Sequence, residues 1–307
     1  GVRVSTVTAP VATEPTVAPR PPERRPKRKW APIILRSYTA LGILYLVLPI
    51  GLMIMYSFNK SAAERVVLKW QGFTTIWYHP AVLFSIGDLT KSLVLSLEIA
   101  VLSTILAVVF GVPIALALVR YRYRGKGTTD ATMFLNIAAP EIVMGAALLS
   151  FFVTLNIPRG FDTILIAHVM FNIAFVVVTV RARLAGFDRA MEEAAQDLGA
   201  GPWTTFQKVT LPLIWPGILA GALLAFALSI DDFVITNFVA GTDTTFPLWV
   251  YGSAKVGTPP QVFVMGTLIF AAGVILAISG YVLQGRKGRH EETDRLVASA
   301  ALQRSGE

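Results

Sequence analysis

Residues 193–212 read EAAQDLGAGPWTTFQKVTLP and form a polar segment between two long apolar stretches of the chain. The segment opens with Glu-Ala-Ala, reaches a glycine after three further residues, and closes with Val-x-Leu-Pro after nine more. The apolar stretches on either side are long enough to cross a bilayer. The segment is therefore predicted to be a loop at a membrane surface.

Local residue preferences predict two short helices in this loop. Asp188 can cap the first helix, and Glu192 and Glu193 suit the positive end of its dipole. Gly199 has the permissive backbone that a sharp bend requires, and Pro202 can begin a second helix. Two short helices joined at a glycine would make a compact knob.

The composition is that of a membrane protein. The 307 residues are 54% hydrophobic and 15% charged, with a mean hydropathy of +0.61. Soluble domains are usually about 25% charged. The chain contains no cysteine, which excludes disulfides and thiol-ligated metals.

Six apolar stretches are long enough to cross a hydrocarbon core of about 30 Å as helices. The fold class is therefore predicted to be all-α, a polytopic membrane protein with six transmembrane helices and one long cytoplasmic loop. The predicted spans are 33–58, 92–119, 131–155, 161–180, 213–239 and 262–283.

The basic residues predict the orientation of these spans. Of the 27 Lys and Arg residues, 21 fall on one side of the arrangement and six on the other. The positive-inside rule places the richer side in the cytoplasm, together with both termini and the loop. The net charge of +8 then needs no nucleic acid to explain it, because topology and anionic lipid headgroups account for it.

Three regions follow from this pattern. Residues 1–30 are rich in Pro, Thr, Val and Arg without helical or strand periodicity, which predicts a disordered basic cytoplasmic tail. Residues 31–288 form the six-span domain, with the loop at 188–212. Residues 289–307 are predicted to be a cytoplasmic C-terminal tail.

Acidic residues within the predicted spans are candidates for function. An acid near the centre of a span costs about 2.5–3.5 kcal/mol, so such residues are expected to face protein or water. Asp232 shares a helix face with Ser229 and Thr236, which favours a place in a transport pathway, whereas Asp231 points about 100° away, to a neighbouring helix or the pathway's edge. The alternative is that both acids serve helix–helix packing as hydrogen-bonded residues. An acidic interior suits a cationic passenger.

Two further polar residues in the spans have open interpretations. Glu141 follows Pro140, and either a structural kink with a satisfied acid or a substrate contact explains this pair. His168 is more typical of a hydrogen-bonded core histidine than of a ligand, and no second His or Cys nearby suggests a metal site. No catalytic residue is predicted.

The loop resembles the EAA loop of ABC-importer inner-membrane permeases, the MetI-like permease superfamily. The matching positions are Glu193, Ala194, Ala195, Gly199, Val209 (where the family usually has Ile), Leu211 and Pro212. The resemblance implies a MetI-like permease fold whose coupling loop contacts an ATPase. The implied coupling residues are Glu193, Ala194, Ala195, Asp197, Gly199, Leu211 and Pro212.

Motifs elsewhere, over residues 35–285, are similar to those of the spermidine/putrescine permeases, most of all the PotC type. They lie at 121–126, 140–144, 175–180, 183–188, 229–232 and 255–257. This resemblance implies a polyamine permease, not an enzyme, in the bacterial cytoplasmic membrane. It implies a homologous second permease in a heterodimer, two copies of an ABC ATPase that uses ATP-Mg, and a soluble or lipid-anchored polyamine-binding protein. No cofactor is expected in this chain.

Alternative functions stay open. Permeases for sulfate, ferric iron or phosphonates share the EAA loop, so a phosphonate, an amino-acid-like compound or another organic cation is an alternative substrate. An ion-coupled secondary transporter could also keep acids in its spans, although the EAA loop argues against it. An intramembrane enzyme is disfavoured because the chain has no HExxH motif.

Overall fold

The computed structural model describes residues 31–60, 69–186, 188–276 and 278–279. Within these ranges the regular structure is helical, apart from one isolated bridge between Asn59 and Phe73. The chain divides into two compact units, residues 1–51 and 52–307. The predicted tails at 1–30 and 289–307 lie outside the described residues.

The described part of the first unit belongs to helix α1 (Ala31–Ser57), which continues into the second unit. Its side chains from Ile34 to Leu48 are exposed, although they are mostly apolar. A helix that is apolar on all sides is expected where lipid surrounds it. This helix confirms the first predicted span.

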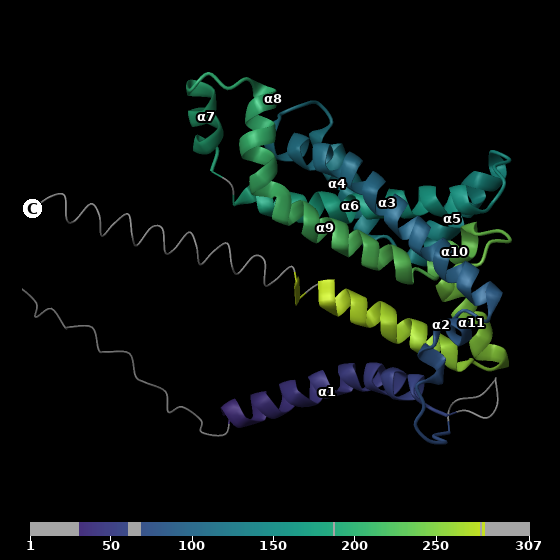
Figure 1. Ribbon diagram of the computed structural model, residues 1–307. Helices are drawn as coiled ribbons and strands as arrows, with labels where there is room; N and C mark the ends of the chain where they lie inside the picture. Colours follow the sequence, from purple (N-terminus) through teal and green to yellow (C-terminus); the bar gives the residue numbers. More distant parts are fainter. Residues whose placement is uncertain (1–30, 61–68, 187, 277, 280–307) are drawn as a thin grey trace, which may run out of the picture. The chain divides into compact units, whose positions relative to one another are not determined.

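Three long helices form the core of the second unit: α3 (Gly87–Arg120), α6 (Phe161–Ala185) and α9 (Leu211–Asp231) (Figure 1). Each packs on the other two. Small residues allow this close packing, as is common between membrane helices. A Cβ atom on Gly111 of α3 would lie 2.8 Å from a methyl group of Val176 on α6.

The predicted span 131–155 is wrong as a single helix. The chain forms α4 (Lys126–Ala138) and α5 (Glu141–Thr154), which are bent by 110° relative to each other. Pro140 explains the break, because proline has no N–H and disfavours helical geometry in the residue before it. Ala139 accordingly has an extended conformation, with ψ at 135°.

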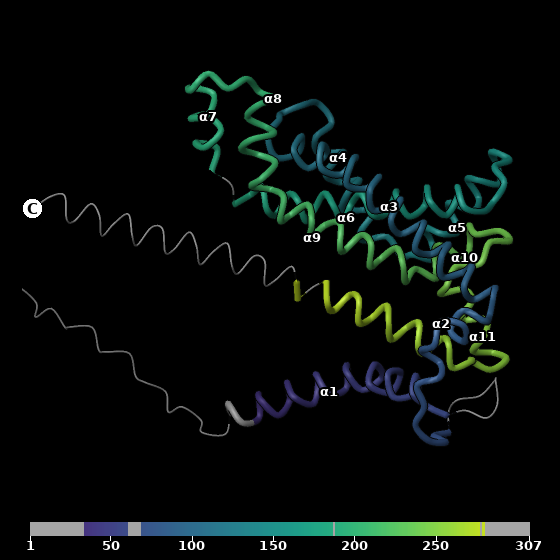
Figure 2. Tube along the Cα trace, viewed as in Figure 1, coloured from purple at the N-terminus to yellow at the C-terminus, as the bar shows by residue number. Residues whose placement is uncertain are grey.

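The predicted span 213–239 also needs correction at both ends. The helix starts earlier, at α8 (Pro202–Thr205), and passes through a wide π-helical turn, η2 (Phe206–Thr210), into α9. It ends at Asp231, and a separate short helix, α10 (Val234–Val239), follows. Figure 2 follows the chain through this interruption.

The remaining elements are short. They are the 3-10 turn η1 (Ile76–Tyr78), α2 (Pro80–Leu83), α7 (Ala190–Asp197), α11 (Phe246–Val256) and an apolar helix at Pro260–Leu276. Phe246 at the start of α11 donates its backbone N–H to Ser96 Oγ of α3, at 2.8 Å. This contact ties α11 to the core.

Four of the described helices are long and apolar enough to cross a membrane, or five if the bent pair α4–α5 counts as one span. They are Ile34–Ser57, Gly87–Arg120, Phe161–Ala185 and Pro202–Asp231. The sixth predicted span, 262–283, overlaps the helix Pro260–Leu276, and its last residues lie outside the described part. The all-α class is confirmed, whereas the count of six spans stays a prediction.

Candidate functional site

A cavity of about 300 Å³ lies where the two interrupted spans meet α6. It is lined by three acidic residues, Glu141, Asp231 and Asp232, and by Asn136. Apolar side chains complete the wall, among them Phe171, Phe175 and Phe233. The cavity therefore combines negative charge with aromatic surface.

The acids reach this cavity because both spans are broken there. Glu141 is the first residue of α5, immediately after the break at Pro140. Asp231 is the last residue of α9, and its side chain is exposed. Irregular backbone at membrane depth is tolerated where it lines a cavity or is buried in protein. Each break therefore presents an acid to the cavity.

Asp232 lies in the interruption between α9 and α10 and is held by hydrogen bonds. Its Oδ2 accepts the backbone N–H of Thr236 at 2.8 Å and the hydroxyl of Thr236 at 2.7 Å. Its Oδ1 lies 3.4 Å from the backbone nitrogen of Ile235, which donates to it. The side chain is only 7% exposed. Asp232 thus acts as a cap for the first turn of α10.

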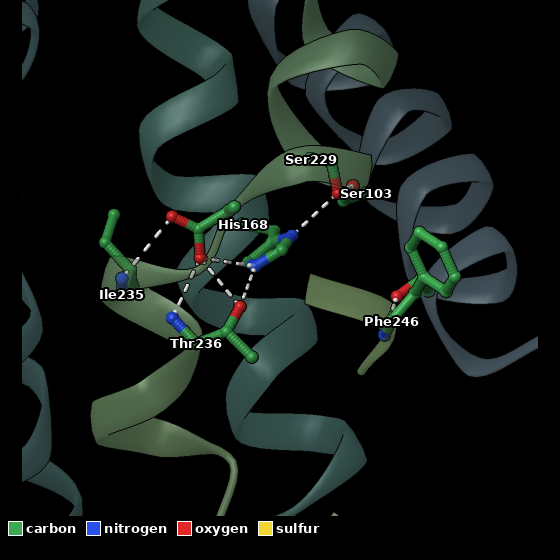
Figure 3. Close-up of polar contacts among 8 residues, drawn as sticks. Ser103, His168, Ser229, Ile235, Thr236 and Phe246 are labelled. Carbon is green, nitrogen blue, oxygen red and sulfur yellow. Dashed lines mark hydrogen bonds and ion pairs between the residues drawn. The ribbon is translucent and has the colours of Figure 1, made fainter. Parts of the chain in front are cut away.

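His168 of α6 joins the residues around this interruption (Figure 3). Its Nδ1 lies 2.6 Å from Ser229 Oγ, and its Nε2 lies 2.9 Å from Thr236 Oγ1 and 3.3 Å from Asp232 Oδ2. Ser229 Oγ is in turn 3.0 Å from Ser103 Oγ of α3. The prediction that His168 is a hydrogen-bonded core residue is confirmed. Its role as the link between the predicted pathway residues was not predicted.

The structure changes the relation between the two adjacent aspartates. A helix that continued through residue 239 would place Asp232, Ser229 and Thr236 on one face. The helix ends at Asp231 instead, so Asp232 is largely buried among hydrogen bonds whereas Asp231 is exposed at the cavity. The pathway role of Asp231, Asp232, Glu141, Ser229 and Thr236 stays a prediction.

The loop forms the two short helices that its sequence predicts. Helix α7 is followed by Gly199, whose φ of +87° lies in the left-handed region, and α8 begins at Pro202. Asp188 Oδ1 accepts the backbone N–H of Ala190 at 3.0 Å and so supports the start of α7. Unlike the prediction, the second helix does not end but continues into α9.

A charged contact attaches α7 to the membrane helices. Glu192 forms an ion pair with Arg120, the last residue of α3, and accepts a hydrogen bond from Thr210 Oγ1. A second cavity, of about 540 Å³, lies between this end of α3 and helices α7 and α8. Sequence reasoning placed Glu192 at a helix start but missed Arg120, whose only signal is its position at the end of a span.

The outer surface of this knob is exposed and partly apolar. None of the residues of α7 is buried, and Leu198, Met191 and Trp203 are 90%, 54% and 67% exposed. Most of the predicted coupling residues share this exposure, whereas Ala195 and Leu211 are half-buried. The exposed ones are Glu193, Ala194, Asp197, Gly199 and Pro212. These three large apolar side chains lie in one short loop outside the predicted spans, which makes the loop a candidate interaction site.

Comparison with known proteins defines the class. Residues 107–290 match the family described as binding-protein-dependent transport system inner membrane component. This match covers more than half of the chain, so the chain belongs to that family of ABC-importer permeases.

Curated relatives are similar over most of the chain. The spermidine/putrescine transport system permease protein PotC of Escherichia coli K12 is 40% identical over 251 residues, which cover 81% of this chain and 93% of that protein. The PotC protein of Haemophilus influenzae is 38% identical over 80% of this chain and 94% of its own length. The putrescine transport system permease protein PotI of Escherichia coli K12 is 37% identical over 86% of this chain and 94% of its own length.

Solved structures support the fold. A chain of a bacterial ABC transporter involved in the import of the acidic polysaccharide alginate matches with a TM-score of 0.59 at 18% identity, covering 84% of this chain and 97% of that chain. A chain of the MetNI methionine ABC transporter in an inward-facing form matches with a TM-score of 0.52 at 19% identity, covering 66% and 95%. The MetI-like permease fold is therefore confirmed.

Proposed function

We propose that this chain is a permease subunit of an ATP-driven importer of polyamines such as spermidine and putrescine, and that it forms half of the translocation pathway. The observation that carries the proposal is the cavity at the two broken spans, where Glu141 and Asp231 meet aromatic side chains. The similarity to PotC and PotI, which are named as spermidine and putrescine permeases, supports the same substrate class.

The chemistry of the cavity suits an alkyl chain that carries several ammonium groups. The carboxylates of Glu141 and Asp231 can pair with ammonium groups, and this attraction is stronger away from bulk water. The rings of Phe171, Phe175 and Phe233 can cover methylene groups and attract a cation over their faces. A passenger with alternating charged and apolar parts fits such a wall.

The loop at 188–212 is proposed to couple the pathway to an ATPase. The exposed side chains of Leu198 and Trp203 would be covered by that partner. This arrangement requires the loop and both termini to lie in the cytoplasm of a bacterial cell, as the distribution of basic residues predicts. The chain would hydrolyse no ATP and hold no cofactor, since ATP-Mg would be used by the ATPase.

The proposed assembly pairs this chain with a homologous second permease, two copies of an ABC ATPase, and a soluble or lipid-anchored binding protein. ATP binding would close the ATPase dimer, and α7 would carry that movement into α3 and α9. The pathway would then open outward to receive the polyamine, and ATP hydrolysis would restore the inward-facing state.

Uptake measurements test the proposal. The complete complex in liposomes should accumulate labelled spermidine or putrescine in a saturable way that requires ATP, and should not accumulate a labelled phosphonate. If the complex accumulated the phosphonate and neither polyamine, the proposed substrate class would be wrong. If polyamine uptake persisted without the ATPase and was driven by an ion gradient, the ATP-driven mechanism would be wrong and the chain would be an ion-coupled transporter.

A further inference from the structure

His168 contacts both sides of the interruption between α9 and α10. On the α9 side its Nδ1 meets Ser229 Oγ, and on the α10 side its Nε2 meets Thr236 Oγ1 and Asp232 Oδ2. The imidazole side chain is only 2% exposed and lies against the ring of Phe171. One buried side chain on α6 therefore fixes the ends of two separate helices.

We propose that His168 is a positioning residue for transport, which holds the interruption so that Asp231, and not Asp232, offers its charge to the passenger. We call His168, Ser229, Asp232 and Thr236 the clasp. The proposal rests on the proposed function for the nature of the passenger, but the contacts that hold the break beside Asp231 are those of the clasp and do not depend on the passenger.

The hydrogen bonds of Asp232 support this division of roles. Its two carboxylate oxygens accept two backbone N–H groups of α10 and one hydroxyl group, and His168 lies within 3.3 Å. A buried carboxylate that is satisfied in this way has little capacity left for another cation. Both aspartates line the cavity, but Asp231 is exposed, whereas the side chain of Asp232 is only 7% exposed. The clasp thus uses one acid of the pair and leaves the other free for the passenger.

The clasp also extends into the core. Ser229 Oγ lies 3.0 Å from Ser103 Oγ, so the chain of polar contacts runs from α3 through α9 to α6 and α10 (Figure 3). Buried hydrogen bonds are costly to leave unmade. Removal of the imidazole would leave Ser229 with Ser103 alone and would remove the contacts of Asp232 and Thr236 to α6. The start of α10, which Asp232 caps, could then move relative to α6 together with Asp231.

The contacts of the two ring nitrogens of His168 can be tested separately with matched substitutions. His168→Gln places an amide near the position of Nε2, so it can keep the contacts to Thr236 and Asp232. His168→Asn places an amide near the position of Nδ1, so it can keep only the contact to Ser229. His168→Leu keeps the apolar volume and removes both. Thr163→Val is the control on the same helix, because it removes a buried contact between α6 and the far end of α10: Thr163 Oγ1 donates to the carbonyl of Val239 at 2.8 Å and also contacts Gly160, outside the clasp.

The rate at which charged reagents modify a thiol in the cavity wall reports on the charge of Asp231. The chain has no cysteine, so Ile137→Cys introduces a single thiol into the cavity wall of this subunit. In the complete complex, the rate of modification of this thiol is measured with a positively charged and with a neutral methanethiosulfonate reagent. The amount of modified thiol is determined on this subunit. The ratio of the two rates measures the negative potential at the cavity.

The proposal predicts how the ratio of the two modification rates differs among the variants. His168→Leu and His168→Asn should lower the ratio roughly three- to tenfold in the Ile137→Cys background, since a carboxylate a few ångström away has an effect of this size or larger. His168→Gln should keep most of the ratio, because its amide can keep the contacts to Thr236 and Asp232. Thr163→Val should leave the ratio within about twofold, because Val239 lies at the end of α10 that is far from Asp231. In spermidine uptake, His168→Leu should raise KM more than His168→Gln does.

Equal ratios in the Gln and Asn variants would overturn the proposal, and so would an unchanged ratio in an assembled His168→Leu complex. If His168→Leu fails to assemble, the comparison of Gln with Asn decides, since both keep a polar side chain. The reagent ratio needs no substrate. A wild-type complex that takes up no polyamine but shows the predicted ratios would therefore overturn the proposed function and leave the clasp supported.

Discussion

Arg120, the last residue of α3, forms an ion pair with Glu192 in the first turn of α7. The same carboxylate accepts a hydrogen bond from Thr210 at the end of η2. One acid therefore connects a long membrane helix, the exposed knob and the start of α9. Because α7 has no buried residue, polar contacts attach it to α3: this ion pair, and the hydrogen bonds of Arg189 to the carbonyls of Val119 and Arg120 at 3.4 Å.

Replacement of Glu192 by alanine should uncouple the knob from α3. The pair is largely buried, with side chains that are 19% and 13% exposed, so both Arg120 and Thr210 would lose a partner. Hydrogen bonds to charged groups contribute about 1.5–3 kcal/mol each. We expect uptake to fall several-fold more than ATP hydrolysis, and parallel assays of both activities in liposomes measure this.

A second ion pair provides the matched control. Arg181 pairs with Asp130, but these side chains are 45% and 34% exposed, and exposed pairs contribute about 0–1 kcal/mol. Asp130→Asn should therefore change the ratio of uptake to hydrolysis little. An equal effect of Asp130→Asn and Glu192→Ala would show that the loss of any charge at this end is sufficient, and the attachment role would be wrong.

Gly199 should tolerate asparagine better than valine. A Cβ atom there would meet no atom within 4 Å, so the cost of substitution comes from the φ of +87° rather than from a clash. The left-handed conformation costs roughly 1–2 kcal/mol for most residues and is easiest for asparagine. Uptake should be near normal in Gly199→Asn and low in Gly199→Val. Gly201→Ser is the control, because Gly201 has a φ of −67° and equally open space.

Leu198→Ser should weaken the binding of an ATPase without weakening the fold. Leu198 is 90% exposed, so its replacement removes almost no packing within this chain. If a partner covers this side chain, the loss is about 1.5–3 kcal/mol of burial. Co-purification of the ATPase in detergent should fall, while the thermal unfolding of this subunit should not change. Val256→Ser, at a residue that is 75% exposed on α11, should leave co-purification unaltered.

The long helices of the core could be predicted from the sequence because apolar length alone defines them. The spans expected at 92–119 and 161–180 lie within α3 and α6. The glycine bend of the loop could also be predicted, since it depends on Gly199 and on residues beside it in the chain. Local signals of this kind do not require knowledge of distant contacts.

The interruptions could be predicted only in part. Pro140 signals a kink, but the bend of 110° depends on what packs on each side of it. The break after Asp231 has no proline or glycine to signal it. It is stabilised by His168, which lies on another helix and contacts Asp232 and Thr236 through space. The separate roles of the two aspartates therefore could not be derived from helical periodicity.

Gly111→Ala should destabilise the core. The added Cβ would lie 2.8 Å from Val176 Cγ1 and 3.0 Å from Val176 Cβ, and Val176 is fully buried. Overpacking of this kind costs about 1–3 kcal/mol. The melting temperature of the purified subunit should fall. Gly127→Ala, in the first turn of α4 with open space around it, should leave it unchanged or raise it slightly, and a similar fall in both variants would contradict this account.

The two aspartates should separate in uptake kinetics. Asp231→Asn removes a charge at the cavity and should raise KM for spermidine roughly tenfold, which corresponds to about 1.4 kcal/mol of binding. Asp232→Asn keeps one oxygen that can accept the backbone N–H of Thr236, since asparagine caps helices well, but its amide nitrogen replaces the oxygen that accepts from Ile235, and the loss of charge weakens the contact to His168. It should lower the maximal rate and change KM less.

Glu141→Gln provides a second test of the same division, because Glu141 lines the cavity and is not part of the clasp. Its effect should resemble that of Asp231→Asn, with a raised KM, and not that of Asp232→Asn. Rates measured over a range of spermidine concentrations separate the two patterns. If Asp232→Asn raised KM as much as the other two variants do, all three carboxylates would contact the passenger, and Asp232 would have to leave its hydrogen bonds during transport.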